Sequence, residues 1–511
     1  MFELKFLGHA SWLIKNNDFK ILCDPWFNPE GAYFSQWHQF PRNDHLFNEL
    51  NLNDLDFVYI SHAHEDHFDE WTLDHLERHV PIYIPKFKDR FLFQQLKKMG
   101  FKDIKELDDE SVVVKNIDIK IIKEEGHLDN DSCLILDDGN KKILNLNDCH
   151  IDFSEIKKHA DEVDLLLLQA SSAIWWPCVY HYNKDDMISY GTSKRRNALK
   201  RALEYAKYLN AKMVIPNAGP PFFYDDNLDI WNLTRKEEWN PFVLMDEAVE
   251  YLNNHDVQSS LVVPGSNIIL KPEKTHFSHN EEDLKIYENL DQYMRDYKQF
   301  LNSKKILKPQ ATEQELSELI GKFSDQLKVI KKISKFYVKK IDFPVFFNFK
   351  SLGKWIMDFS DDRCLIPFDQ QEYKYGFILD PHTVCHLFRE RQIDFERYFL
   401  GCNFKCKRSP DVYNEYLFAL LKYFDTKRFL TSEKIYSERE NLLDQTFVLK
   451  HNDKSFEVQK YCPHMLADLE EIGFVDDDAN FVCPLHGWKF DLSTGKCDKN
   501  GHCLKIRSIN D

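Results

Sequence analysis

Two short segments near the C-terminus each combine a cysteine with a histidine. The first reads Cys462-Pro463-His464, and the second, after 18 intervening residues, reads Cys483-Pro484-Leu485-His486. Two thiolates and two imidazoles could hold a pair of irons, with the two cysteines on one iron and the two histidines on the other. They could also hold one zinc ion, which accepts the same four ligands in a structural site. The spacing alone therefore predicts a metal site and leaves its metal open.

The residues after the second segment favour iron. They read Gly487-Trp488-Lys489-Phe490-Asp491, a continuation that a zinc site does not require. With this continuation the C-terminal region resembles the Rieske [2Fe–2S] domain, in which two histidines replace two cysteines on one iron and raise the reduction potential. The resemblance implies an electron-transfer cluster with four ligands: Cys462, His464, Cys483 and His486.

A second group of metal-capable side chains follows a short apolar segment in the N-terminal part of the chain. The segment Asp56–Ile60 is expected to be a strand, and four such residues follow it: His62, His64, Asp66 and His67. In an extended chain His62 and His64 point to the same side. Asp66 and His67 are expected at the start of a helix that runs to His79, facing the same space. The pattern predicts a metal site, and a solvated polar loop is the alternative.

This second pattern resembles that of the metallo-β-lactamase superfamily, an αββα sandwich that holds one or two metal ions. The upstream segments Gly8–Trp12 and Cys23–Trp26 look like the opening strands of that family, in which Asp24 is a structural hydrogen-bonding residue. Carried over residue by residue, the resemblance adds His127 to His62 and His64. It also implies that Asp148, at the end of an apolar strand, is the bridging carboxylate.

The fifth motif of that family is where this chain departs from the pattern. A histidine is expected after the strand Met213–Pro216, but the chain reads Asn217-Ala218-Gly219. A second metal ion would have Asp66, His67 and Asp148 and no terminal histidine. A single iron, or a second ion held partly by water or substrate, therefore fits the sequence. Three other histidines could add a ligand or could be packed or solvated residues: His9, His150 and His181.

The two sites together predict redox chemistry. A hydrolase needs no electrons, whereas a Rieske cluster does nothing but transfer them. Zinc has no accessible second valence, whereas iron has, and imidazole with carboxylate suits Fe(II). We therefore expect an oxidoreductase, a monooxygenase with one or two non-haem irons that activates O2 and hydroxylates a small-molecule substrate. Its electrons would come from a ferredoxin, a cytochrome b5-like protein or an NAD(P)H reductase.

Two other functions fit the same motifs less well. The first is a zinc-dependent metallo-β-lactamase-fold hydrolase with a redox-sensing Rieske domain. The second is an electron-transfer or scaffold protein whose N-terminal site is inert. The complete set of His62, His64, Asp66, His67, His127 and Asp148 counts against an inert site.

One known family, the CMP-N-acetylneuraminate hydroxylases, joins these two kinds of domain, and the chain resembles it beyond the metal motifs. The resembling segments include Phe6–Ala10, Tyr59–His62, Lys142–Asn145, Ala218–Pro220 and Arg408–Tyr413. That family also lacks the fifth histidine, but it places its Rieske domain first, whereas here the domain comes last. The resemblance implies a related hydroxylase and leaves open whether the substrate is a nucleotide sugar.

Two groups of residues could contact such a substrate. Lys194, Arg195 and Arg196 could form a basic pocket or a solvated helix start. The aromatic residues Trp175-Trp176 and Phe222-Phe223-Tyr224 could line a pocket or pack in a core.

The order of elements predicts an α/β multidomain chain. We expect a metallo-β-lactamase-like αββα sandwich over 1–270, a helical linker over 271–310, an α+β middle domain over 311–431 and an all-β Rieske domain over 432–511. The middle part has a weaker resemblance to SCP2-like domains. Among the expected elements are the helices Glu70–His79 and Arg196–Leu209, the strand Leu261–Val263, and only strands and turns after about Ser432.

Composition limits the partners and the compartment. The 511 residues carry a net charge of −17, and no cluster of Lys and Arg supplies the basic face that nucleic acid binding needs. No apolar run reaches the ~18 residues of a membrane span, and the N-terminus has no secretory pattern. We therefore expect a cytoplasmic protein in which ten of the 12 cysteines are reduced thiols. Whether electrons pass within one chain or between subunits of a homo-oligomer is open.

Overall fold

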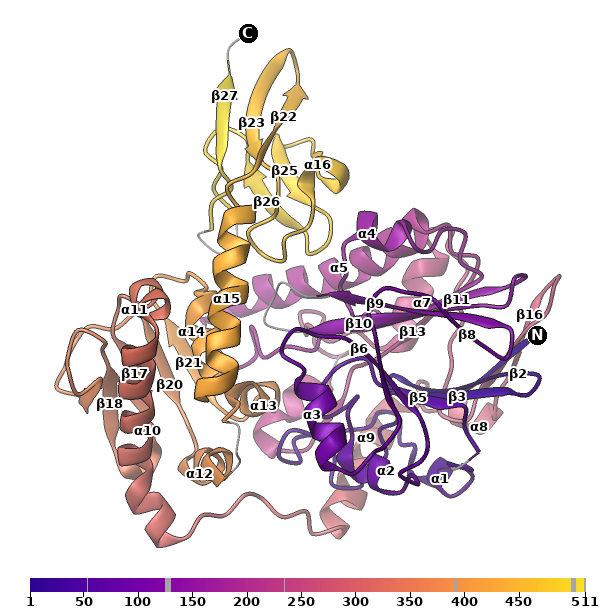
Figure 1. Ribbon diagram of the computed structural model, residues 1–511, viewed down its shortest axis with the longest axis horizontal. Coiled ribbons are helices and arrows are strands. Elements are labelled where there is room, and N and C mark those ends of the chain that lie inside the picture. Colours follow the sequence, from indigo (N-terminus) through magenta and orange to yellow (C-terminus); the bar gives the residue numbers. More distant parts are fainter. Residues whose placement is uncertain (53, 125–129, 234, 390–392, 498–501, 510–511) are drawn as a thin grey trace. The chain divides into compact units, whose positions relative to one another are not determined.

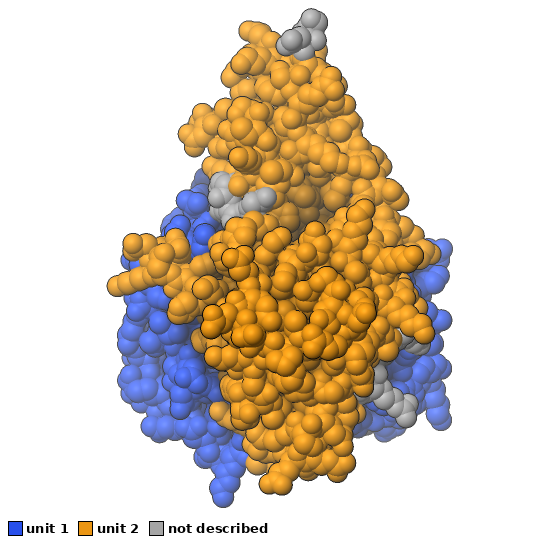
Figure 2. All heavy atoms as spheres, turned by 90° about the vertical axis from the view of Figure 1, so that its left-hand side faces the viewer, with its two compact units in different colours: residues 1–125, 129–173, 188–306 blue, residues 126–128, 174–187, 307–511 orange. Residues whose placement is uncertain are grey.

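The computed structural model describes residues 1–52, 54–124, 130–233, 235–389, 393–497 and 502–509 (Figure 1). The chain forms two compact units, which Figure 2 colours separately. Unit 1 comprises residues 1–125, 129–173 and 188–306, and unit 2 comprises residues 126–128, 174–187 and 307–511. Among the described residues, no helix combines the length and apolar character needed to cross a bilayer.

Unit 1 is built on two large sheets (Figure 1). The strand order of the first is β16-β15-β1-β2-β3-β5-β6-β7, and that of the second is β13-β12-β11-β10-β9-β8. The strands of the first are β1 Phe2–Gly8, β2 Ser11–Asn16, β3 Phe19–Cys23, β5 Phe57–Tyr59, β6 Ile82–Pro85, β7 Ile104–Leu107, β15 Asn267–Leu270 and β16 Thr275–Ser278. Those of the second are β8 Val112–Val114, β9 Ile117–Glu124, β10 Asp131–Asp137, β11 Lys142–Asn147, β12 Leu165–Gln169 and β13 Val214–Asn217. A small third sheet pairs β4 Trp37–His38 with β14 Phe222–Phe223.

Alternating apolar residues explain how the two sheets pack. Phe2, Leu4 and Phe6 share one face of β1 and are buried in the same core as Leu134 and Leu165 of the second sheet. A separate core lies on the other face of the first sheet. It includes Leu73, Leu92 and Leu96, which belong to helices that cover this face. The helices of unit 1 are α1 Asp44–Phe47, α2 Glu70–Asp74, α3 Phe91–Lys98, α4 Phe153–Lys157, α5 Lys184–Tyr208 (its first turn in unit 2), α6 Asp229–Asn232, α7 Met245–Asn253, α8 Glu281–Leu284 and α9 Leu290–Ser303. This is the expected αββα arrangement.

Most of the expected linker, residues 271–306, belongs to unit 1. It contains β16, α8 and α9, and four residues of α9 are buried in the core between the sheets: Leu290, Met294, Tyr297 and Leu301. The domain boundaries predicted from the sequence stay predictions.

Unit 2 contains a mixed α and β part and a C-terminal part made mainly of strands. The first part has a five-stranded sheet of order β19-β18-β17-β20-β21. Its elements are α10 Glu313–Ile333, α11 Lys335–Lys340, β17 Val345–Asn348, β18 Lys354–Met357, β19 Leu365–Pro367, β20 Tyr375–Ile378, α12 Pro381–Arg389, α13 Phe395–Leu400, β21 Lys405–Arg408, α14 Glu415–Lys422 and α15 Thr426–Leu442. The C-terminal part has two three-stranded sheets, formed by β22 Thr446–His451, β23 Lys454–Gln459 and β27 Ile506–Ile509, and by β24 Phe474–Val475, β25 Asn480–Cys483 and β26 Trp488–Asp491, with α16 Leu469–Ile472 between β23 and β24.

Two helices differ from the sequence expectation. The helix expected over Glu70–His79 ends at Asp74, because the Arg78 guanidinium donates to the carbonyl oxygens of Leu73 and Leu76 and satisfies the helix end. The helix expected from Arg196 begins at Lys184. The amphipathic pattern of α5 is weak at its start, where Gly191 allows the Trp239 carbonyl oxygen to approach too closely for any Cβ.

Two further expectations of local structure are wrong. Residues 261–263 form no strand, although Val262 and Val263 are buried, because the Val263 N–H bonds to the Ser266 hydroxyl and no neighbouring strand. Strands and turns were expected after Ser432, but α15 continues to Leu442. The sequence of α15 shows no apolar periodicity, because its buried face includes the polar residues Ser432, Tyr436 and Arg439.

Candidate metal centres

The histidine-rich segment of unit 1 follows the carboxyl end of β5, which lies between the parallel strands β3 and β6. Asp66 and His67 lie in a turn before α2 and do not belong to the helix, contrary to the sequence expectation. The turn is closed because the N–H groups of His67 and Phe68 bond to the His64 carbonyl oxygen at 3.0 and 2.7 Å. The helix begins later because the Asp69 side chain caps it.

Asp24, which follows the carboxyl end of β3, orients His67. Its Oδ2 lies 3.0 Å from the Nδ1 of His67, and its two carboxylate oxygens also accept the N–H and hydroxyl of Ser61 at 2.8 Å each. A proton on Nδ1 that faces a carboxylate leaves the Nε2 lone pair for a metal. The structural role that the resemblance implies for Asp24 matches these contacts.

The Nε2 of His67 faces two carboxylates. It lies 3.3 Å from Oδ1 of Asp148, which follows β11, and 3.7 Å from Oδ2 of Asp66. The His67 Nε2 and the Asp148 Oδ1 are both buried, and neither makes a hydrogen bond of good geometry among the described residues. Buried polar atoms without partners are costly, and a cation between them removes that cost. These residues therefore fit a metal ion.

His62 and His64 complete this side of the pocket. The Nδ1 of His62 lies 3.1 Å from the Asp131 carboxylate and 2.9 Å from the Ser61 hydroxyl. Its Nε2 lies 2.9 Å from the Nδ1 of His64. The ring centroids of His62 and His67 are 4.2 Å apart, so the structure brings three imidazoles together here.

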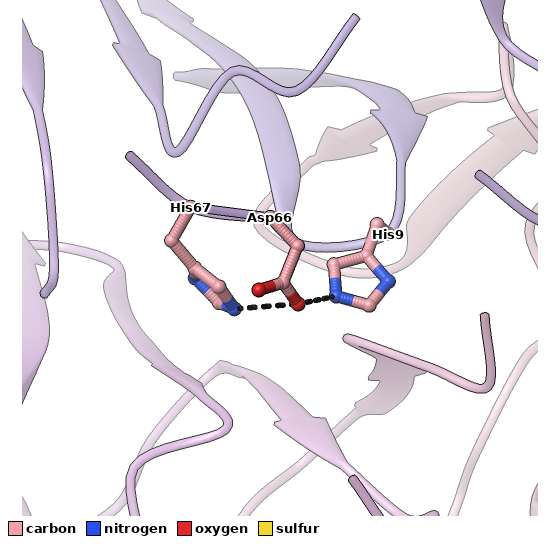
Figure 3. A group of neighbouring side chains, drawn as sticks. All are labelled: His9, Asp66 and His67. Atoms are coloured by element: carbon pink, nitrogen blue, oxygen red, sulfur yellow. Dashed lines mark hydrogen bonds and ion pairs between the residues drawn. The ribbon is translucent and has the colours of Figure 1, made fainter. Parts of the chain in front are cut away.

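His9 approaches the pocket from the turn between β1 and β2. Its Nε2 lies 2.8 Å from Asp66 Oδ2, and Figure 3 shows Asp66 between the imidazoles of His9 and His67. The Tyr33 hydroxyl donates to the other oxygen of Asp66 at 2.5 Å. Among the described residues, two groups of three side chains could each hold a metal ion, because the ligand atoms within each group lie within 4.8 Å of one another. One group is His9, Asp66 and His67, and the other is His62, His67 and Asp148.

The negative charges of the carboxylates in this pocket are balanced by positive charge on the imidazoles. Burial alone would raise the pKa of Asp66 and Asp148. The neighbouring imidazoles, His67 foremost, together outweigh burial and lower the pKa of both carboxyls. Burial opposes a charged His67, yet the Asp148 and Asp66 carboxylates raise the pKa of its imidazole well above the usual value. Protons on imidazole thus balance the carboxylates, and a bound divalent cation would supply the same positive charge.

The structure brings together most of the N-terminal residues singled out in the sequence. His62, His64, Asp66, His67 and Asp148 share one pocket, and His127 lies outside the described residues. His150 belongs to neither group of three, and the His181 N–H, in unit 2, bonds to the Cys406 carbonyl oxygen. Sequence reasoning gave no role to Tyr33 or Asp131. No motif marks Tyr33, whereas Asp131 lies four residues after His127, a candidate ligand in the sequence.

The C-terminal ligand candidates also come together. Cys462 and Cys483 are buried with their thiols hydrogen-bonded to each other, and this contact and burial raise the pKa of the Cys483 thiol. The N–H groups of Leu485 and His486 point at the Cys483 sulfur, which favours a thiolate. The ring centroids of His464 and His486 are 4.5 Å apart. Two adjacent thiols and two adjacent imidazoles fit a [2Fe–2S] cluster of the Rieske type.

A buried ion pair supports the first cluster loop. Arg439 of α15 pairs with Glu415 of α14, and its Nη2 donates to the carbonyl oxygens of Pro463 and His464 at 2.7 and 2.5 Å. Trp488 stacks on the His464 ring at 4.3 Å with an interplanar angle of 9°.

The residues considered for a substrate pocket are mostly structural. The Arg195 guanidinium donates to the carbonyl oxygens of Asn240 and Phe242 and pairs with Glu247. Trp175 packs on Phe399 and Phe418 within unit 2. Phe222 is buried in the core of unit 1.

Comparison with known protein families agrees with the three-part architecture. Residues 3–218 match a beta-lactamase superfamily domain, residues 319–438 match an Rv3818-like, SCP2-like domain, and residues 428–510 match a Rieske [2Fe-2S] domain. The predicted fold class is thereby confirmed.

Individual relatives extend this agreement to the whole chain. A Mycolicibacterium smegmatis protein named for a Rieske 2Fe-2S iron-sulfur centre is 30% identical over 99% of this chain and 100% of its own. A similarly named Mycobacterium tuberculosis protein is 29% identical over 98% and 99%. The cytidine monophosphate-N-acetylneuraminic acid hydroxylase of Danio rerio is 28% identical, over 42% of this chain and 38% of its own.

Among solved structures, CmlA, a diiron beta-hydroxylase from Streptomyces venezuelae, is 17% identical over 54% of each chain with a TM-score of 0.34. At this level the likeness says nothing about activity. The match to the Mycolicibacterium smegmatis protein carries more weight, because it reaches 30% identity over nearly the whole length of both chains. This chain therefore belongs to that family of Rieske 2Fe-2S iron-sulfur proteins, with a metallo-β-lactamase-fold domain first and the Rieske domain last.

Proposed function

We propose that this protein is a Rieske-coupled non-haem iron monooxygenase that hydroxylates a small-molecule substrate. The observation that carries the proposal is the pairing of two sites in one chain. One is a buried pocket in which groups of two imidazoles and one carboxylate converge, and the other is a Rieske domain with its two thiols and two imidazoles together.

The ligand chemistry supports iron in the N-terminal pocket. Two histidines and one carboxylate are the donor set of many non-haem Fe(II) oxygenases, which leaves positions open for O2 and substrate. We assign the metal to His62, His64, Asp66, His67, His127 and Asp148, and the cluster to Cys462, His464, Cys483 and His486. When bound, iron supplies the one-electron chemistry with O2 that zinc lacks.

The surrounding residues of the chain would hold and orient these ligands. Asp24 keeps the Nε2 of His67 turned into the pocket, and Asp131 does the same for His62 through its Nδ1. The pKa of Tyr33 is raised well above its usual value by burial and by Asp66, so its hydroxyl stays protonated and donates to Asp66. Such outer contacts fix the geometry and basicity of the ligands.

Electron supply follows from the stoichiometry of hydroxylation. Placing one atom of O2 in the substrate and reducing the other to water consumes two electrons and two protons. A Rieske cluster carries electrons singly, so an external donor, a ferredoxin, a cytochrome b5-like protein or an NAD(P)H reductase, would reduce it twice in each turnover.

A nucleotide sugar is one candidate for the substrate. The Danio rerio relative is named for a nucleotide sugar, which makes such an anion one candidate. Arg195, one of the basic residues considered for it, is already engaged by Glu247 and by backbone carbonyl groups. A cytoplasmic location and a homo-oligomer stay predictions.

The test is an isotope experiment with the full-length, cluster-loaded protein. Cell extract metabolites, a reductase system and ¹⁸O2 are supplied, and products are searched by mass spectrometry for one incorporated ¹⁸O atom. The proposal predicts such a product from the wild-type protein and none from His62→Ala with an intact cluster EPR signal. Incorporation that is unchanged in His62→Ala, or a product that carries oxygen from water with zinc in the pocket, would contradict it.

A further inference from the structure

The two groups of three ligands in the pocket share one atom. His67 contributes to both groups. Its Nδ1 is hydrogen-bonded to the Asp24 carboxylate, so only its Nε2 faces the pocket. One nitrogen lone pair binds one ion. If the pocket takes two ions, His67 serves the position beside Asp66, and His62 and His64 serve the other position. The position beside Asp66 then needs a further nitrogen ligand.

The residue expected to supply that nitrogen is absent from the sequence. Asn217 ends β13 where the metallo-β-lactamase resemblance implies a histidine, and it is buried. Its side-chain oxygen and nitrogen have no hydrogen-bond partner among the described residues. The next residue, Ala218, donates its N–H to the carbonyl oxygen of His9 at 2.9 Å. The place of the absent ligand therefore lies directly beside His9.

His9 is held in a position that suits a ligand. It turns the chain between β1 and β2 with φ +52°, and its side chain is buried and meets the edge of Trp26 at 5.0 Å between ring centroids. Its Nε2, the Oδ2 of Asp66 and the Nε2 of His67 lie within 4.8 Å of one another (Figure 3). The Nδ1 of His9 has no hydrogen-bond partner among the described residues, so the polar contact of this buried imidazole is the one from its Nε2 to Asp66.

We propose that His9 is a metal ligand and completes, with Asp66 and His67, a second ion position in place of the histidine missing at Asn217. The position then has two imidazoles and one carboxylate, a donor set suited to Fe(II). The pocket would hold two ions, one at this position and the other next to Asp148, whose Oδ1 lies 3.3 Å from the His67 Nε2. The number of ions does not depend on the proposed hydroxylase function, whereas their identity as iron does.

The test counts metal in the full-length protein with its cluster in place. Wild-type protein and His9→Gln are dialysed anaerobically against Fe(II), and iron is measured in excess of the cluster irons. Wild type should retain two further ions, and His9→Gln should retain one, with the second bound at least tenfold more weakly. The Gln side chain can still donate a hydrogen bond to Asp66, so a residue that merely orients Asp66 would keep both ions in this variant.

A matched control is His38→Gln. His38 is also a buried histidine of unit 1, but it lies on β4, and burial lowers its pKa to about 4. This variant should retain both ions. The proposal is overturned if His9→Gln keeps both ions at wild-type affinity or if wild type binds only one.

If His9→Gln does not fold, as judged by circular dichroism and the cluster EPR signal, crystals of the iron-loaded wild-type protein decide. An anomalous difference map at the iron edge should place an ion within coordination distance of the His9 Nε2. A map that shows an ion elsewhere in the pocket and none beside His9 contradicts the proposal. Zinc in both positions would leave the role of His9 intact and would defeat the hydroxylase function, so the two failures are distinguishable.

Discussion

The guanidinium of Arg439 lies 2.5 Å from the carbonyl oxygen of His464, a proposed ligand of the cluster. The same side chain pairs with Glu415, so a buried charge on α15 joins the cluster loop to α14 of the SCP2-like part. Both partners are largely shielded from solvent, with side-chain exposures of 2% and 11%. The cluster loop is thereby fixed from outside the Rieske sheets.

We expect Arg439→Met to destabilise unit 2, because it leaves the Glu415 carboxylate buried and without its guanidinium. Removing one partner of a buried pair costs about 3–5 kcal/mol. The measurement is the urea midpoint of the unit 2 transition, followed with the cluster absorbance. A midpoint that equals that of wild type would show that the pair contributes nothing.

The double variant Glu415→Gln/Arg439→Met separates stability from the effect on the cluster. Replacing both charges should restore most of the stability. The reduction potential should nevertheless stay below the wild-type value by about tens of millivolts, because a positive charge and its donors near the cluster are lost. Potentiometric titration monitored by EPR measures this shift, and a wild-type potential in the double variant would contradict it.

Cys483→Ser should remove the cluster and leave the N-terminal metal. The Cys483 sulfur is one of two thiols in the site, and a serine hydroxyl does not replace a thiolate ligand of iron. We expect loss of the visible and EPR signals of the cluster, an unchanged content of the other metal, and no multiple turnover. Cys402→Ser, at a buried cysteine that is not among the proposed cluster ligands, is the control. Loss of the N-terminal metal in Cys483→Ser would argue that the two sites are not separate.

Asp24→Asn should weaken metal binding without removing a ligand. The carboxylate faces the Nδ1 of His67, and loss of such an outer contact typically lowers metal affinity by about 10–100-fold. Fe(II) affinity measured by anaerobic competition with a chelator tests this. Asp164→Asn is the control, since Asp164 is also buried but pairs with Lys141 and Lys212. Equal affinities of the two variants would refute a role for Asp24 in orienting His67.

The sequence predicts much of the N-terminal site because its motif is local. His62, His64, Asp66 and His67 lie within six residues, and one strand followed by one turn places them together. His9 and Tyr33 are different, because only the sandwich fold brings their loops to Asp66. Helix α15 was missed for a related reason: its buried face includes a charged residue, Arg439, whose partner lies on another helix. Periodicity of apolar residues cannot reveal such a pair.

Acid should destabilise unit 1 partly through His38. Burial lowers the pKa of His38 from 6.5 to about 4, so between these values the unfolded chain binds a proton that the folded chain does not. Stability therefore falls as the pH drops from about 6.5 to about 4, by about 3 kcal/mol in all. His38→Gln should flatten this part of the pH profile of the urea midpoint. An identical slope in the variant would exclude His38 as a source of acid sensitivity.

The central claim is that the N-terminal pocket holds redox-active iron in the same chain as a Rieske cluster. The most direct measurement is metal analysis of protein purified anaerobically, combined with EPR of the reduced cluster. The account predicts iron in excess of the two cluster irons, little zinc, and loss of only the excess iron in His62→Ala. Two irons per chain with zinc in the pocket would contradict it.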